Sequence, residues 1–337
     1  MSTAPVVVDS IVVTGLVDGR LVARHRMTGR SLWQLPFSGA EFRAERLLNV
    51  GDMVIVPHFL LHGVDIRTGA RRWTFGGGGS SAGVLTPTIA GDTVFVAGYT
   101  GGTAAALNAR TGEVLWRREF EYTVYHPSVT SDLALYPLRR IAGPSFLVAL
   151  DRGTGEERWR VQVPDSQGVG NGIISGGAVL GDRTVLGTSH GMVLAVRLSD
   201  GVLLWTAGGD GEMNRAYFSQ PLAWQGISVM LRTADGVFEG RSPVDGQLLW
   251  STALGSSVMY SPRPCGEYFC HAAGRTLVLD KGGNVLWADG GGSGAIYLSN
   301  VTVAPDGIMY AGVYYNAPQR GYVRAFRSGV SIGSHGR

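Results

Sequence analysis

A few titratable side chains stand among aromatic residues along this 337-residue chain, and they are the residues best suited to chemistry. An imidazole, a phenol, a carboxylate and a guanidinium can together supply hydrogen bonds and proton transfer to a bound molecule. We expect four residues of these types to be catalytic, namely His126, Tyr217, Glu212 and Arg215.

Ten further residues, most of them polar or aromatic, lie near these four or at corresponding positions of a repeated sequence unit described below. An aromatic collar above a ring of polar groups is typical of a pocket that takes a small molecule. We expect these residues to bind the substrate: Arg46, Tyr122, Tyr125, Asn171, Phe218, Gln220, Met259, Tyr260, Tyr297 and Asn300.

This combination favours a cofactor-independent cyclase, lyase or isomerase that acts on a small, largely apolar molecule. Aromatic walls would hold such a substrate in a reactive conformation. The chain has one lysine, Lys281, among its 29 basic residues. This bias is typical of high-GC genomes, in which natural product pathways are common. The alternative is that the aromatic residues pack between repeats and that the protein is a non-catalytic scaffold for other proteins.

The sequence gives little reason to expect a metal or another cofactor. His58 and His62 are four residues apart, a spacing that places two ligands on one face of a helix, but they fall in a strand pattern. Ser189 and His190 lie in a turn, and no phosphate-binding or dinucleotide-binding loop occurs. We therefore expect no metal site and no cofactor.

A repeated sequence motif determines where all of these residues lie in the fold. Seven segments carry a glycine four residues before a tryptophan, and successive tryptophans lie 37 to 46 residues apart. A period of this length is typical of propellers and solenoids. The pairs are Gly29 and Trp33, Gly69 and Trp73, Gly112 and Trp116, Gly155 and Trp159, Gly201 and Trp205, Gly246 and Trp250, and Gly283 and Trp287.

The third copy shows the unit most clearly, with short apolar runs at 86–90, 93–97, 104–108 and 114–116 between glycine turns. Runs of this length without a helical period predict a four-stranded antiparallel meander. One such sheet cannot bury both of its faces, so the copies must stack around an axis. We predict an all-β, eight-bladed β-propeller of four-stranded antiparallel blades, with seven blades as the alternative.

We expect a single domain over residues 1–337. The eighth copy lacks the terminal glycine and tryptophan, and its outer edge would be completed by residues 330–332 or left open. The expected blades are 3–37, 42–76, 84–120, 124–163, 173–207, 217–253, 259–289 and 296–333.

Two sets of loops should emerge on one face of this propeller: those leading into the first strand of each blade and those joining the second and third strands. The Thr-Gly turns on the opposite face are short and uniform, so we expect binding on the first face. The longer loops 136–145 and 314–321 would form its rim. Aligned residues would ring the end of the channel there: Thr3, Arg46, Thr86, His126, Gly176, Gln220, Ser261 and Asn300.

The repeat resembles the pyrroloquinoline-quinone (PQQ) repeat, whose pattern Ala-x-Asp-x-x-Thr-Gly-x-x-x-Trp is seen from Ala149 to Trp159. The resemblance covers nearly the whole chain and implies the propeller fold. The family includes quinoprotein dehydrogenases, a lipoprotein scaffold of outer-membrane assembly, and sensor domains. The dehydrogenases carry an adjacent Cys-Cys pair that this chain lacks, so a PQQ-dependent dehydrogenase is only a remote alternative.

Composition and charge exclude several classes of protein and of partner. With 45% hydrophobic and 16% charged residues the chain is globular. The net charge of +3 contains no basic run, so we expect no nucleic acid partner, and no stretch is apolar enough for a membrane span. The first residues show no export signal. We therefore expect a cytoplasmic protein, a monomer or weak homo-oligomer, with Cys265 and Cys270 as reduced thiols.

Overall fold

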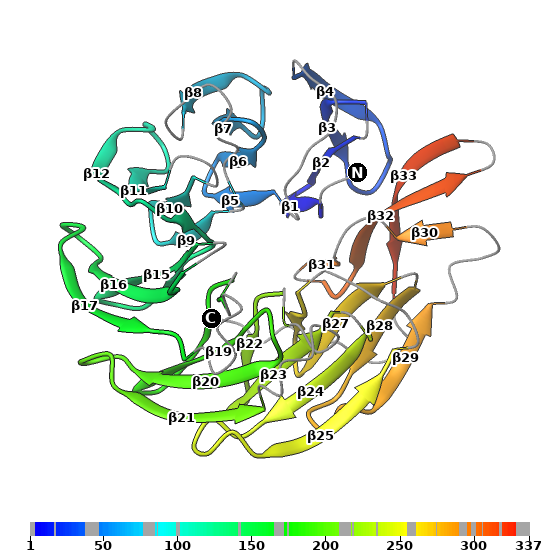
Figure 1. The fold of residues 1–337 in the computed structure, drawn as a ribbon. Coiled ribbons are helices and arrows are strands. Elements are labelled where there is room, and N and C mark those ends of the chain that lie inside the picture. Colours follow the sequence, from blue (N-terminus) through cyan, green and yellow to red (C-terminus); the bar gives the residue numbers. More distant parts are fainter. Residues whose placement is uncertain are drawn as a thin grey trace.

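Eight small antiparallel sheets stand around a ring in the computed structural model (Figure 1). The eight-bladed propeller is confirmed, and the seven-bladed alternative is excluded. No described segment forms a helix that is long and apolar enough to cross a membrane. The structure describes residues 4–16, 18–37, 47–76, 85, 87–98, 102–140, 143–164, 172–173, 175–208, 217, 219–233, 235–254, 261–273, 275–289, 295–297, 301–304, 306–316 and 319–327.

Each blade is formed by consecutive strands of the chain. Blades 1 to 4 comprise β1 (Val6–Val8), β2 (Ile11–Gly15), β3 (Arg20–His25) and β4 (Ser31–Pro36); β5 (Leu48–Val50), β6 (Met53–Pro57), β7 (Leu61–Asp65) and β8 (Arg71–Phe75); β9 (Thr88–Ala90), β10 (Thr93–Ala97), β11 (Thr103–Asn108) and β12 (Val114–Glu119); and β13 (Thr123–Val124), β14 (Ser128–Val129), β15 (Leu133–Arg139), β16 (Phe146–Asp151) and β17 (Glu157–Gln162).

Blades 5 to 8 continue around the ring. They comprise β18 (Ala178–Leu180), β19 (Arg183–Gly187), β20 (Met192–Arg197) and β21 (Leu203–Gly208); β22 (Leu222–Trp224), β23 (Ile227–Arg232), β24 (Val237–Arg241) and β25 (Leu248–Ala253); β26 (Arg263–Cys265), β27 (Tyr268–Ala273), β28 (Arg275–Leu279) and β29 (Val285–Asp289); and β30 (Ala295–Tyr297), β31 (Thr302–Val303), β32 (Met309–Asn316) and β33 (Gln319–Phe326).

The tryptophan of the outer strand explains why its neighbour on the third strand is glycine or alanine in six of the seven blades that carry it, whereas blade 7 has Val278 opposite Trp287. In blade 2, Trp73 pairs with Gly63, and a Cβ on Gly63 would lie 2.1 Å from the indole ring. Ala149 occupies this place opposite Trp159 in blade 4. The register shifts by one residue just beyond this pair in all seven blades that carry the tryptophan, which is a β-bulge. The alanine of the repeat pattern is therefore a packing requirement.

The same tryptophan also joins its blade to the next one. The indole of Trp73 lies over Gly112 of blade 3 and donates a 3.0 Å hydrogen bond to the Ala109 carbonyl. The contacted glycines have φ between +72° and +77°, a region that favours glycine. The tryptophan and glycine pairs between successive blades are Trp33 and Gly69, Trp73 and Gly112, Trp116 and Gly155, Trp159 and Gly201, Trp205 and Gly246, and Trp250 and Gly283.

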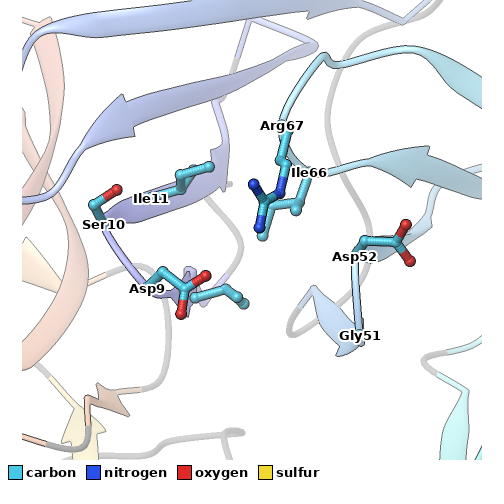
Figure 2. A pocket seen from close by; sticks show the side chains of 8 residues that line it. Asp9, Ser10, Ile11, Gly51, Asp52, Ile66 and Arg67 are labelled. Carbon is cyan, nitrogen blue, oxygen red and sulfur yellow. The ribbon is translucent and has the colours of Figure 1, made fainter.

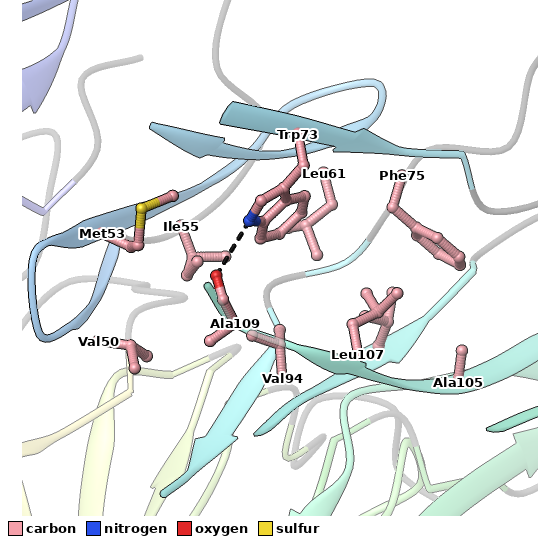
Figure 3. Close-up of a cluster of buried hydrophobic side chains, with 11 residues drawn as sticks. Val50, Met53, Ile55, Leu61, Trp73, Phe75, Val94, Ala105, Leu107 and Ala109 are labelled. Carbon is pink, nitrogen blue, oxygen red and sulfur yellow. Dashed lines mark hydrogen bonds between the residues drawn. The ribbon is translucent and has the colours of Figure 1, made fainter. Parts of the chain in front are cut away.

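The hydrophobic core lies between blades. In Figure 3, Ile55, Leu61 and Trp73 of blade 2 face side chains of blade 3. Val94 and Leu107 of blade 3 are fully buried in this cluster. Every interface of this kind needs two blades, so the sheets stabilise one another in sequence around the ring.

The ring closes by contact between blade 8 and blade 1. The Thr302 hydroxyl donates a hydrogen bond to the Pro5 carbonyl, and Arg26 pairs with Asp306 at 2.9 Å. In blade 8, β30 and β31 both pair with β32, and β33 is its outermost described strand. The predicted outer-edge segment 330–332 lies outside the described residues.

Blade 1 offers a natural control for the tryptophan and glycine contact. Gly29 has φ +70°, like the other turn glycines, but a Cβ there would meet nothing within 4 Å. Gly29→Ala should therefore cost only the left-handed backbone strain, about 1–2 kcal/mol. Gly112→Ala should cost about 1–3 kcal/mol more, because its Cβ would lie 2.6 Å from the Trp73 ring. Denaturant unfolding of both variants measures the difference, and equal losses would contradict the role of the contact.

Candidate interaction face

The segment that leads into blade 4 contains three of the candidate site residues. The first strand of this blade is split into β13 and β14, and Tyr125 and His126 lie in the gap between them. Both are half-buried, and the Tyr125 N–H donates a 2.9 Å hydrogen bond to the Pro137 carbonyl. Tyr122 lies one residue before β13, also half-buried. The split strand therefore holds these residues on the loop face of the propeller.

Tyr217 is located in the interface between blades 5 and 6. Its side chain is 2% exposed, packs with Val185 and Met230, and donates a 2.8 Å hydrogen bond to Glu239. Burial and the Glu239 carboxylate raise the pKa of Tyr217 well above its usual value. Glu239 is itself buried and pairs with Arg241 at 2.7 Å. These contacts tie the phenol into the framework, which favours a structural role for this candidate catalytic residue.

Polar groups at the inner ring bond neighbouring blades to one another. The N–H of Gln220 in blade 6 donates a 3.0 Å hydrogen bond to the Ser261 hydroxyl of blade 7. The Thr88 hydroxyl donates to the Pro127 carbonyl at 2.6 Å, and the Ser175 hydroxyl donates to the Ser219 carbonyl at 3.1 Å. The ring of polar groups at the channel end thus contains hydrogen bonds that hold the blades together.

Most of the remaining candidate residues lie outside the described part of the chain, and the roles expected of all the candidates stay predictions. Tyr297 lies in β30, and its backbone pairs with Val313. The remaining candidates lie outside the described residues: Glu212, Arg215, Arg46, Asn171, Phe218, Met259, Tyr260 and Asn300.

A cluster of half-buried aromatic rings and exposed arginines surrounds Tyr122. Because Thr123 pairs with Arg139 across β13 and β15, Tyr122 lies beside Arg140, whose guanidinium is 4.6 Å from the centre of the phenol ring. Phe146 meets the other side of Tyr122 edge-on, with 5.7 Å between ring centres. We call this cluster the blade 4 patch and define it by Phe120, Tyr122, Arg140, Phe146 and Arg160.

Arginines join the rings of the blade 4 patch. The Arg160 guanidinium lies 5.6 Å from the Phe146 ring centre and 6.0 Å from that of Phe120. Arg140 also pairs with Glu121 at 2.6 Å. The aromatic residues are half-buried and the arginines are exposed, a composition typical of the residues that dominate protein interfaces.

Only part of this patch was among the candidates read from the sequence. Tyr122 was expected to bind a ligand, and Arg140 was placed in a rim loop. Phe120, Phe146 and Arg160 were missed, because Phe120 directly follows β12 and the other two lie in β16 and β17, where they read as ordinary packing. The alternation of aromatic residues and arginines on adjacent strands was the available signal.

His58 and His62 pack in the hairpin between β6 and β7. His62 Nδ1 lies 2.9 Å from the Thr74 hydroxyl, and the Phe37 ring lies 5.0 Å from the His62 ring and 5.4 Å from the His58 ring. Nowhere in the described part of the chain do three possible metal ligands gather. Phe59, at the hairpin tip, is 40% exposed and adds an apolar group to the loop face.

One cavity lies on the opposite face, between blades 1 and 2 (Figure 2). It measures about 270 Å³, and its lining includes Asp9, Asp52 and Arg67. Figure 2 shows the Arg67 guanidinium turned into it. Its lining has no histidine, tyrosine or cysteine and includes none of the candidate residues.

The two cysteines form a disulfide, which corrects the expectation of reduced thiols. Cys265 and Cys270 are joined across the hairpin of β26 and β27, and both are buried. The spacing of the two cysteines allowed the bridge, but the expected cytoplasmic location had favoured reduced thiols. Disulfides persist in oxidising compartments.

Burial lowers the pKa of His62 to about 4, with a further contribution from the nearby positive charge of Arg71. Since an unfolded histidine titrates near 6.5, the folded state binds fewer protons between pH 6.5 and 4. Stability should be full above pH 6.5 and fall as the pH drops towards 4. His62→Asn should make this slope shallower, by up to one proton. Unfolding curves over this pH range measure the slope, and identical slopes would refute the assignment.

Sequence comparison finds relatives of one kind. The family model described as outer membrane protein assembly factor BamB matches residues 57–208 and 143–296. A Legionella pneumophila protein of that name is 24% identical over 209 residues, which cover 60% of this chain and 44% of the relative. A Kangiella koreensis protein of the same name is 27% identical, over 47% of this chain and 31% of the relative. The matched part is less than half the length of these relatives.

Solved structures show the same fold. BamB from Moraxella catarrhalis has a TM-score of 0.70 at 17% identity and covers 97% of this chain and 98% of its own. The computationally designed Ika8 protein has a TM-score of 0.73 at 18% identity, over 93% and 96%. A europium-containing methanol dehydrogenase gives 0.65 at 14% identity, over 93% and 82%. At these identities an enzyme, a designed protein and an assembly factor share the fold alone.

The expected cytoplasmic location is wrong, since the relatives are named as outer membrane assembly factors. That location had rested on the first residues of the chain. The PQQ-repeat resemblance is confirmed over residues 57–296, well over half of the sequence. The chain belongs to the PQQ-repeat propeller family described as outer membrane protein assembly factor BamB.

Proposed function

We propose that this propeller is a non-catalytic scaffold that binds protein partners on its loop face. The observation that carries the proposal is the blade 4 patch, in which three half-buried aromatic rings and two exposed arginines lie together where the end of blade 3 meets blade 4. Arginine and aromatic residues are enriched at interfaces because each combines a large apolar area with a polar group.

The two arginines of the patch are paired with carboxylates of their own chain. Arg140 and Arg160 already hold acidic neighbours, Glu121 at 2.6 Å and Glu157 at 2.7 Å. Their guanidiniums lie 4.6 Å from the Tyr122 ring centre and 5.6 Å from that of Phe146, and each is paired with a carboxylate, so the charges of the patch are balanced. A partner residue that stacks on Tyr122 or Phe146 would bury apolar area without leaving a guanidinium unpaired.

A cyclase, lyase or isomerase gains no support from the described residues or from the relatives. The Tyr217 hydroxyl is committed to Glu239 inside an interface, and His126 stands in a split inner strand. The relatives are named for assembling outer membrane proteins, which favours protein partners over a small substrate. Because this chain matches only part of each relative, its partners remain part of the proposal.

Site-specific photo-crosslinking in the cell of origin tests the scaffold. With p-benzoylphenylalanine at Tyr122 we expect a covalent adduct to one protein, identified by mass spectrometry, and at least tenfold less adduct when Arg140→Glu is added. The control is the same group at Met27, which is 69% exposed on a Thr-Gly turn of blade 1. Equal adducts at both positions, or none at Tyr122, would overturn the proposal.

The disulfide gives an independent test of the compartment. The protein isolated without reductant should take up no alkylating reagent after denaturation, because Cys265 and Cys270 are joined. Closing so short a loop contributes about 2 kcal/mol. A Cys265→Ala, Cys270→Ala variant should therefore lose about that free energy of unfolding and become insensitive to reductant. Two alkylated cysteines in the isolated protein would contradict an oxidising compartment.

A further inference from the structure

The cavity between blades 1 and 2 is lined by charged side chains that the fold does not use (Figure 2). Its apolar lining residues, Val8, Ile11 and Ile66, belong to the hydrophobic cluster between these two blades. Asp9 and Arg67 line it as exposed residues. Within the described part of the chain, neither side chain has a hydrogen bond or an ion pair. The cavity therefore joins an apolar wall to two unpaired charges.

The next interface, between blades 2 and 3, shows why Arg67 is unpaired. Arg110 directly precedes the Thr-Gly pair of blade 3, as Arg67 does in blade 2. Arg110 pairs with Asp52 of blade 2 at 3.3 Å and with Asp92 of blade 3 at 3.7 Å. Both aspartates are the second residue of the turn that joins the first two strands of their blades. In blade 1 this position holds Ser10, so Arg67 meets no carboxylate there.

The first residue of the same turn in blade 1 is also unusual. Asp9 has φ +50°, in the left-handed region that favours glycine. The equivalent residues of blades 2, 3 and 5 are Gly51, Gly91 and Gly181, with φ between +55° and +62°. Asp9 thus carries backbone strain that no described contact of its carboxylate offsets. Strain of this kind is concentrated at binding sites, where the side chain is needed for another purpose.

The unpaired groups specify a ligand that carries one charge of each sign. Since Arg110 neutralises Asp52, the described lining keeps one unpaired cation, Arg67, and one unpaired anion, Asp9. A guanidinium binds a carboxylate through two parallel hydrogen bonds, and a carboxylate accepts hydrogen bonds from an ammonium group. A ligand with both groups would leave no charge of the cavity unpaired.

We propose that this cavity binds a free aliphatic α-amino acid. The carboxylate of the ligand would lie on Arg67, its ammonium group on Asp9, and its side chain on the apolar wall. The cavity measures about 270 Å³, which is slightly below the range of about 300–1,000 Å³ for pockets that take drug-sized molecules. A ligand of the size of leucine suits it. The site lies on the face opposite the blade 4 patch, so the inference does not depend on the scaffold function.

Titration of the full chain with L-leucine, followed by saturation-transfer NMR, tests the ligand class. We expect saturable binding. Two analogues each lack one charge: 4-methylpentanoate has no ammonium group, and 3-methylbutylamine has no carboxylate. Each should bind about tenfold more weakly or worse, because a hydrogen bond to a charged group contributes that much. Glycine, which lacks the aliphatic side chain, should also bind more weakly.

Two variants test the assigned residues without disturbing the fold. Arg67→Gln should weaken leucine binding about tenfold and leave the free energy of unfolding unchanged, because the guanidinium has no partner to lose. The matched control is Arg24→Gln, which removes the same charge from an exposed residue of blade 1 outside the cavity and should change binding less than about twofold. Asp9→Gly should bind leucine and 4-methylpentanoate equally, and it should be no less stable, because the turn then has its usual glycine.

Isoleucine methyl spectra locate the bound ligand. Leucine should shift the methyl signals of Ile11 and Ile66, assigned by substitution of each with valine, and leave that of Ile227 in blade 6 unchanged. No saturable binding, equal affinity for leucine and 4-methylpentanoate in the unaltered chain, or unchanged leucine binding by Arg67→Gln would each overturn the proposal. Shifts at Ile227 without shifts at Ile11 and Ile66 would overturn it in favour of another site.

Discussion

The contact between a tryptophan and the turn glycine of the next blade is the constraint on which the rest of this structure depends. The indole ring covers a backbone turn that only glycine can form without both strain and a clash. The indole N–H then satisfies a carbonyl of the same neighbour, as Trp116 does with Arg152 at 2.9 Å. Each copy of the motif therefore describes a relation between two blades, and no blade completes its own packing.

This relation explains why the sequence predicted the fold so well. The glycine and the tryptophan recur in seven copies because the contact between blades demands them, and the eighth blade was recognised from its other strands. The closure of the ring was harder to predict, since Arg26 and Asp306 meet only because the first and last blades become neighbours. The split first strands of blades 4 and 8 were also missed, because a short gap such as Tyr125–Pro127 leaves the apolar pattern intact.

The roles of the candidate site residues stay predictions, and aligning the repeats has a limit as a way to find such residues. Aligning the copies identifies positions that are structurally equivalent, and equivalent positions near the axis are needed to join blades. Gln220 and Ser261 illustrate this: they were read as parts of a polar ring around a pocket, and they bond blade 6 to blade 7. Cys265 and Cys270 show a second limit of the sequence. Their five-residue spacing allows a disulfide, but the geometry of the hairpin decides whether the disulfide forms.

Residues that determine binding are instead expected at positions whose side chains are not needed to pack the blades. Trp250 and Gly240 are fixed by their contact, and the residues on either side of the tryptophan are then free to vary. Across the outer strands they do vary, from Arg71 and Arg72 in blade 2 to Leu248 and Leu249 in blade 6. Because the packing of the tryptophan does not require this difference, it is better explained by what the surface meets than by how the ring is held together.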